Sequence, residues 1–188
     1  MEIRGIDVSA WQGKIDWKTV ADYSMGFAIL RITEAGNVID SYFEQNFSEC
    51  RKYNIPVGAY KYSYAMTVAE IQSEARKVVE VLNGRKLQYP VWLDLEWNNQ
   101  RSLGAEQIHK LAEAFEKIIT AAGYKIWYLL QCGLVPECNL QPSGKNMISG
   151  LHVIRHQITA PYRNDSGRTL VWAGSIPAKR RYQASADL

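Results

Sequence analysis

The stretch Gln88-Tyr-Pro-Val-Trp-Leu-Asp-Leu-Glu-Trp-Asn98 joins a run of apolar and aromatic residues to two carboxylic acids. The run that begins at Pro90 predicts a buried β-strand, and the acids at its end are Asp94 and Glu96. Because side chains alternate along a strand, residues two apart share a face and lie about 6.5–7 Å apart. We therefore expect both acids to point the same way at the carboxyl end of this strand.

Two carboxylates held this close do not ionise equally, because the charge of one disfavours the charge of the other. Glycoside hydrolysis uses such a division, with one acid donating a proton and the other acting as a carboxylate. Leu93, Leu95 and Trp97 take the opposite face of the strand, which we expect to pack against helices. A strand end that merely carries two acids is the alternative interpretation of the pair alone.

The size and composition of the chain predict one domain with a sizeable core, since it has 188 residues and is 47% hydrophobic. No apolar run approaches the roughly 20 residues needed to cross a bilayer. The first four residues lack the zones of a signal peptide, so this chain shows no export route. Cys50, Cys132 and Cys138 are an odd set without metal-site spacing, so we expect neither a disulfide framework nor a metal site.

The net charge of +3 is concentrated toward the end of the chain. Residues 131–188 contain seven Lys and Arg against three Asp and Glu, whereas residues 1–130 contain fifteen against sixteen. A basic tail can indicate nucleic-acid binding, but these charges are scattered between Pro, Gly and Ser without interleaved aromatic residues. We therefore expect no nucleic-acid partner.

Strand-like and helix-like segments alternate through the first 130 residues. The expected strands are 3–9, 26–32, 56–63, 90–96 and 124–130, and the expected helices are 17–23, 41–53, 67–83 and 102–122. This alternation predicts an α/β fold with parallel strands, either a barrel or an open sheet. A doubly wound sheet usually carries a glycine-rich phosphate loop after its first strand, and residues 7–13 are not such a loop. We therefore predict a (β/α) barrel of the TIM type.

Polar residues follow the predicted strands where such barrels build their active sites. Asp7 ends the first strand, Arg31 and Glu34 follow the second, and Tyr62 ends the third. Tyr60 and Tyr62 share one face, and although an aromatic stripe is usually core, a phenol at a strand exit can face a substrate.

Four ordered motifs resemble the family 25 glycoside hydrolases, the Chalaropsis-type lysozymes that cut peptidoglycan. They are Gly5–Ser9 with Trp11-Gln12-Gly13, Leu30–Glu34, Ile55–Ser63 and Leu93–Glu96. Ala35 stands where that family commonly has glycine, and the resemblance covers about residues 3–128.

The resemblance implies a muramidase that hydrolyses β-1,4 bonds between N-acetylmuramic acid and N-acetylglucosamine. Glu96 would protonate the glycosidic oxygen, Asp94 would stabilise positive charge or orient the acetamido group, and Asp7 would complete the acidic site. The expected substrate-binding residues are Tyr62, Trp11, Arg31, Glu34 and Tyr60.

The resemblance implies that no metal or organic cofactor is needed and that the protein acts outside the cell or at the cell wall. We also expect a monomer. A glycan-binding pseudo-enzyme is the main alternative. The other is an unrelated barrel enzyme for phosphorylated substrates, but the late glycines are too dispersed for a phosphate site.

Beyond Leu130 the strand and helix patterns stop, so we divide the chain into a barrel portion, 1–130, and an atypical tail, 131–188. The codons permitted around Trp127 and Met147 allow family-like segments in the two alternative reading frames. We therefore hypothesise that the frame slipped near Ile126. The expected consequence is a barrel whose C-terminal part is incomplete and irregular.

Overall fold

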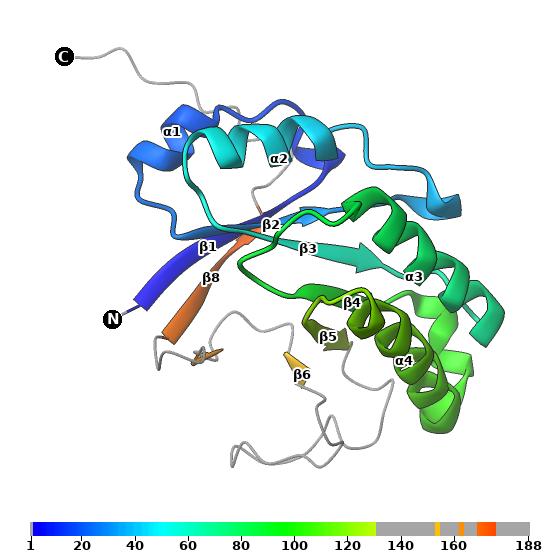
Figure 1. Ribbon diagram of the computed structural model, residues 1–188. Coiled ribbons are helices and arrows are strands. Elements are labelled where there is room, and N and C mark those ends of the chain that lie inside the picture. Colours follow the sequence, from blue (N-terminus) through cyan, green and yellow to red (C-terminus); the bar gives the residue numbers. More distant parts are fainter. Residues whose placement is uncertain (1, 131–152, 155–161, 164–168, 176–188) are drawn as a thin grey trace.

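The computed structural model describes residues 2–130, 153–154, 162–163 and 169–175 (Figure 1). Parallel strands alternate with helices through the first 130 residues, as the sequence predicts. The strands are β1 (Glu2–Val8), β2 (Phe27–Arg31), β3 (Val57–Tyr62), β4 (Val91–Leu95) and β5 (Ile126–Leu130). The helices are α1 (Trp17–Asp22), α2 (Phe43–Lys52), α3 (Val68–Leu82) and α4 (Gly104–Ala121), with short 3-10 turns η1 (Ala10–Gln12), η2 (Ala35–Asn37) and η3 (Asn98–Ser102).

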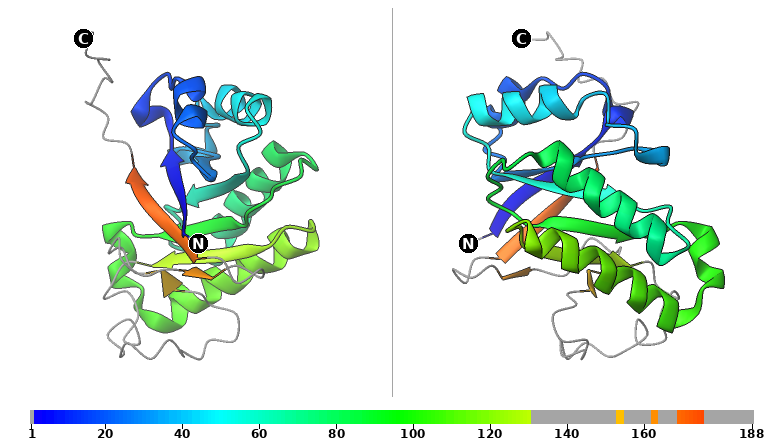
Figure 2. Two further views of the ribbon diagram at one scale, coloured as in Figure 1. Left: turned by 90° about the vertical axis from the view of Figure 1, so that its left-hand side faces the viewer. Right: turned by 45° about the vertical axis from the view of Figure 1, so that its right-hand side comes forward.

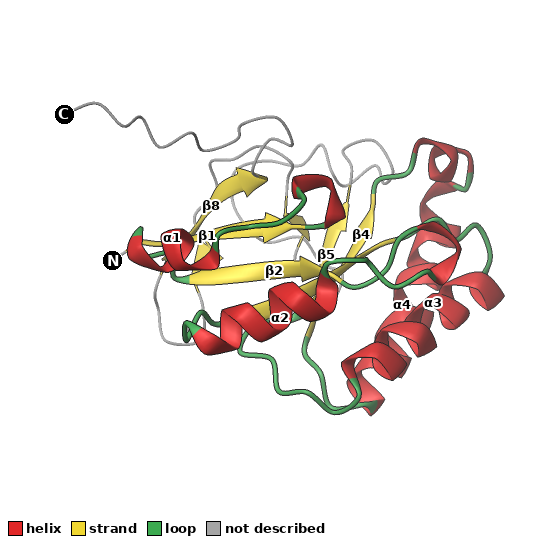
Figure 3. Cartoon of the chain, turned by 90° about the horizontal axis from the view of Figure 1, so that it is seen from above, coloured by secondary structure: helices red, strands yellow, loops and turns green. Residues whose placement is uncertain are grey.

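The five strands pair in parallel in the order β5-β4-β3-β2-β1 and form a curled half-barrel. The helices lie along one side of this curved sheet, as the views in Figures 2 and 3 show. The carboxyl ends of all five strands therefore meet at one rim. The prediction of an α/β barrel of the TIM type is confirmed for this part of the chain.

The sheet separates two clusters of buried side chains. The large outer cluster joins Leu93 and Leu95 to residues of the helices, including Ile71 and Phe115. The small inner cluster contains Phe27, Ile29 and Trp92, with Tyr60 and Trp127 packed against it. A side chain at Gly5 would collide with the Phe27 ring, which explains the glycine at this inward position.

Helix ends follow the local sequence signals. Thr67 and Glu70 form a capping box at the start of α3, and Asn83 ends the helix in the left-handed conformation with φ 43°. Asp16 caps α1 by accepting a hydrogen bond from the Thr19 amide. None of the helices that the structure describes is long and apolar enough to span a membrane.

The tail contributes strands that its sequence did not predict. β8 (Thr169–Ser175) pairs in parallel with β1, β6 (Val153–Ile154) pairs in parallel with β5, and β7 (Tyr162–Arg163) pairs antiparallel with β8. Backbone pairing at the free edges of β1 and β5 does not require an amphipathic pattern, so periodicity gave no signal for it. Cys132 and Cys138 lie outside the described residues.

Candidate active site

Three acids occupy the inner side of the rim. Asp94 is the last but one residue of β4 and pairs with Tyr62 of β3, and Glu96 follows the strand directly. Asp7 is the last but one residue of β1, between Ile6 and Val8, which both join the outer cluster. Alternation along the strand therefore directs Asp7 inward, toward the face that also carries Asp94.

Asp94 is buried among groups that disfavour its charge. Its side chain is only 8% exposed, and its Oδ1 accepts no hydrogen bond from the residues that the structure describes. Burial raises the pKa of Asp94 well above its ordinary value, and the charges of Glu96 and Asp7 raise it further. Strand alternation thus places Asp7 and Asp94 on the same face of the sheet, where their negative charges disfavour one another.

Two tyrosines line the same inner face. Burial, followed by the charges of Asp94, Tyr64 and Glu96, raises the pKa of Tyr62 to about 12. Tyr60 is packed against the inner cluster, and burial raises its pKa as well, with the charge of Asp7 as the next cause. Both side chains therefore stay protonated near neutral pH and can donate hydrogen bonds.

Arg31 and Glu34 are tied into a network with Asp40. Arg31 Nε donates to Asp40 Oδ2 at 2.7 Å, and its guanidinium also pairs with Glu34 Oε1 at 3.0 Å. Asp40 accepts two further hydrogen bonds from the backbone amides of Ala10 and Tyr42, each at 2.9 Å. The structure thus gives Arg31 a role in joining the loops after β1 and β2 at the rim.

Trp11 lies on η1, directly after Ala10, and is 73% exposed. Its loop is the one held by Asp40, so Trp11 is presented at the rim by a fixed backbone. No local sequence pattern indicates this role for Asp40, because the Asp40–Ala10 contact joins residues 30 positions apart.

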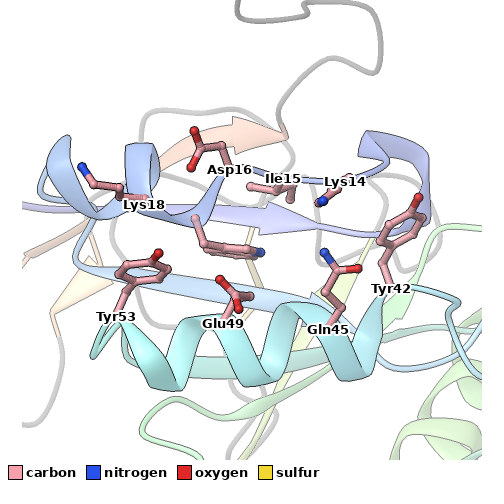
Figure 4. Close-up of a pocket in the computed structure, with 9 residues that line it drawn as sticks. Lys14, Ile15, Asp16, Lys18, Tyr42, Gln45, Glu49 and Tyr53 are labelled. Atoms are coloured by element: carbon pink, nitrogen blue, oxygen red, sulfur yellow. The ribbon is translucent and has the colours of Figure 1, made fainter.

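A cavity of about 720 Å³ lies on the outer side, between the segment that leads into α1 and the helix α2 (Figure 4). Lys14, Asp16 and Lys18 approach it from one side, and Tyr42 and Tyr53 stand at its two ends. None of the three rim acids lines this cavity. Within the described residues, no group of three or more His, Cys, Asp or Glu side chains is arranged to hold a metal ion.

The family model described as glycosyl hydrolases family 25 matches residues 6–146. The chain belongs to this family. The match includes all three rim acids and continues past residue 128, where the sequence motifs end.

This family 25 chain is similar to two known proteins over part of its length. It is 31% identical over 122 residues to the uncharacterized protein YegX of Escherichia coli K12, an alignment that covers 62% of this chain and 43% of YegX. The structure of the modular autolysin LytC from Streptococcus pneumoniae matches with a TM-score of 0.62 and 25% identity, over 69% of this chain and 32% of LytC. The chain thus spans less than half the length of these relatives.

A family 25 glycosyl hydrolase from Bacillus anthracis matches a larger share of the chain. Its structure aligns with a TM-score of 0.66 and 21% identity, and the alignment covers 89% of this chain and 76% of the other. At this identity the likeness establishes the fold.

Proposed function

We propose that this family 25 protein is a muramidase that hydrolyses β-1,4 bonds between N-acetylmuramic acid and N-acetylglucosamine in peptidoglycan. The observation that carries the proposal is Asp94, a buried acid with a raised pKa that lies beside Glu96 and Asp7 at the rim of the half-barrel. Perturbed acids gathered at the carboxyl ends of parallel strands are typical of catalytic sites.

The chemistry that we propose divides the work between the acids. Glu96 is half-buried just beyond the strand and protonates the glycosidic oxygen as its bond to the anomeric carbon breaks. Water then supplies the oxygen that replaces it on the anomeric carbon. Asp94 lies deeper, and burial together with the charges of Glu96 and Asp7 raises its pKa. Asp94 stabilises the positive charge that develops near the anomeric carbon or orients the acetamido group of the substrate, and Asp7 is the third acid of the site.

The residues around the acids would bind the glycan. The Tyr62 and Tyr60 hydroxyls remain donors at neutral pH, and Trp11 offers an exposed ring at the same rim. Arg31 and Glu34 would hold the loop beside them. The autolysin LytC has been solved in complex with a synthetic peptidoglycan ligand, which supports peptidoglycan as the substrate class and the cell wall as the site of action.

The test is the release of reducing ends from purified peptidoglycan by the wild-type protein and by Glu96→Gln. Loss of the proton donor should lower kcat by roughly 10²–10⁴-fold, while the variant still binds the polymer. Glu113→Gln, at an exposed position on α4, is the matched control and should keep wild-type activity. Binding by the wild-type protein without any release of reducing ends would identify a glycan-binding pseudo-enzyme instead.

We propose further that the tail from residue 131 is an atypical segment that arose from a shift of reading frame near Ile126. The family match continues beyond Ile126 and ends at residue 146. Sequencing of the nucleotides for codons 120–188 tests the idea. Stop codons or unrelated residues in both alternative frames would refute it.

A further inference from the structure

Three aromatic side chains form a continuous cluster at the rim beside the acids; we call Tyr62, Tyr64 and Trp97 the rim aromatic cluster. The Tyr62 and Tyr64 ring centroids lie 5.1 Å apart. The Tyr64 and Trp97 rings meet edge to face, with centroids 5.5 Å apart. Tyr64 comes two residues after β3, and Trp97 comes two residues after β4 and directly after Glu96, so the cluster starts at the acids.

The backbone that carries Tyr64 is held by a buried carboxylate. Glu74 of α3 is 7% exposed, and it accepts hydrogen bonds from the Tyr64 amide at 3.1 Å and from Ser63 Oγ at 2.7 Å. The buried Lys61 ammonium lies 3.6 Å from Glu74 and 5.8 Å from the centroid of the Tyr64 ring. Tyr64 is therefore fixed by contacts to its backbone and to its ring.

A buried amide joins the two loops of the cluster. Gln100 of η3 is fully buried, and its Nε2 donates to the carbonyl oxygens of Ser63 at 3.3 Å and Ala65 at 3.0 Å. The backbone N–H of Gln100 in turn donates to the backbone carbonyl of Trp97 at 2.9 Å. This network costs conformational freedom, and it holds Tyr64 and Trp97 in one relative position.

A fixed, half-buried pair of aromatic rings beside the proposed catalytic acids is suited to bind a sugar ring. One face of a β-linked pyranose presents axial C–H groups, and these pack on the electron-rich face of an aromatic ring. The buried Gln100 amide holds the two loops together, so the rings are in position before a sugar binds. We propose that Tyr64 and Trp97 form a sugar-binding subsite that takes an N-acetylated pyranose of the glycan, adjacent to the ring that is cleaved. The inference rests on the proposed function.

The test measures how affinity depends on chain length, in a Glu96→Gln background that does not cleave. The probes are the dimer and the tetramer of β-1,4-linked N-acetylglucosamine, titrated by calorimetry. Trp97→Ala and Tyr64→Ala should each weaken tetramer binding by about 3- to 10-fold and reduce its advantage over the dimer. Trp97→Phe, which keeps a ring, should retain most of that advantage. Tyr23→Ala, at an exposed tyrosine at the end of α1, is the control and should bind like the parent.

In the cleaving background, Trp97→Ala should raise KM for peptidoglycan more than it lowers kcat, because a subsite that holds a ring other than the cleaved one binds it in both the ground state and the transition state. Unchanged tetramer binding in both alanine variants, with wild-type melting temperatures, would overturn the subsite. Failure of the parent to bind either oligomer would overturn it too. A wild-type protein that releases no reducing ends, while tetramer binding still depends on Trp97, would refute the muramidase proposal and keep the subsite.

Discussion

Two buried carboxylates on opposite sides of the same sheet differ in what surrounds them. Glu74, on the helix side, is 7% exposed and receives two hydrogen bonds and a lysine ammonium. Asp94, on the inner side, is 8% exposed, and the charges acting on it are those of two other acids. The two side chains are almost equally buried. They differ in their neighbours: Glu74 has hydrogen-bond donors and a lysine beside it, whereas Asp94 has two acids.

The contrast indicates what each acid is for. A buried charge costs several kcal/mol unless hydrogen bonds and a counter-charge compensate it. Glu74 has both and holds the loop after β3 in place. For Asp94, no described residue donates a hydrogen bond to Oδ1, and the charges that act on it are negative. A buried acid whose charge is not compensated is typical of functional groups and not of stabilising ones. Replacing each acid by its amide should therefore change stability in opposite directions.

Glu74→Gln should have the largest effect on stability. The change leaves the fully buried Lys61 without its counter-charge, and we expect unfolding to become easier by about 3 kcal/mol. Urea unfolding at neutral pH measures this. Adding Lys61→Met should recover much of the loss, because the orphaned charge is then gone. An unchanged urea midpoint in Glu74→Gln would show that the contacts of Glu74 do not stabilise the fold, contrary to the comparison with Asp94.

Asp94→Asn should instead stabilise the protein at neutral pH, by on the order of 2 kcal/mol, while it lowers activity. In the unfolded chain Asp94 ionises near its ordinary pKa of 3.8, and in the fold it ionises at a higher pH. Wild-type stability therefore falls as pH rises from 3.8 toward the folded pKa, and then levels off. The advantage of Asp94→Asn should widen over that window. Equal pH dependence in both proteins would show that Asp94 is not perturbed.

Much of this architecture follows from local sequence. The alternation around Asp94 and Leu95 predicted which side chains face inward, and helical periodicity predicted α1 and α3 close to where they lie. The roles of Asp40 and Gln100 could not be predicted this way, because their contacts to Ala10 and Ser63 join positions 30 and 37 residues apart.

The end of a strand also limits such prediction. Alternation predicted that Trp97 packs against helices with Leu93 and Leu95, but β4 ends at Leu95 and the Trp97 ring meets Tyr64 at the rim. β8 was missed for a different reason: it pairs with β1 through the backbone, and pairing of this kind leaves no periodic signature in side chains.

Tyr62→Phe probes the inner face without changing its charge. The hydroxyl is expected to donate one hydrogen bond to the glycan, so its loss should lower kcat/KM by about fivefold, equivalent to about 1 kcal/mol. Because the pKa of Tyr62 is raised to about 12, its ionisation lies far above the working range. The pH profile of the variant between pH 4 and 9 should therefore keep the wild-type shape. A shift of the alkaline limb would contradict the assignment of Tyr62 as a neutral donor.

Glu44→Gln extends the comparison to an exposed carboxylate and should have the smallest effect. Glu44 receives two hydrogen bonds from the Arg85 guanidinium, at 2.9 and 2.8 Å, but its side chain is 61% exposed. Water solvates both charges when the pair separates, so the loss should stay below about 1 kcal/mol and shrink further in high salt. Arg85 would still lie over the Phe47 ring, 5.0 Å from its centroid. Urea unfolding at low and high salt tests this, and a loss as large as that of Glu74→Gln would mean that burial is not what separates the two acids.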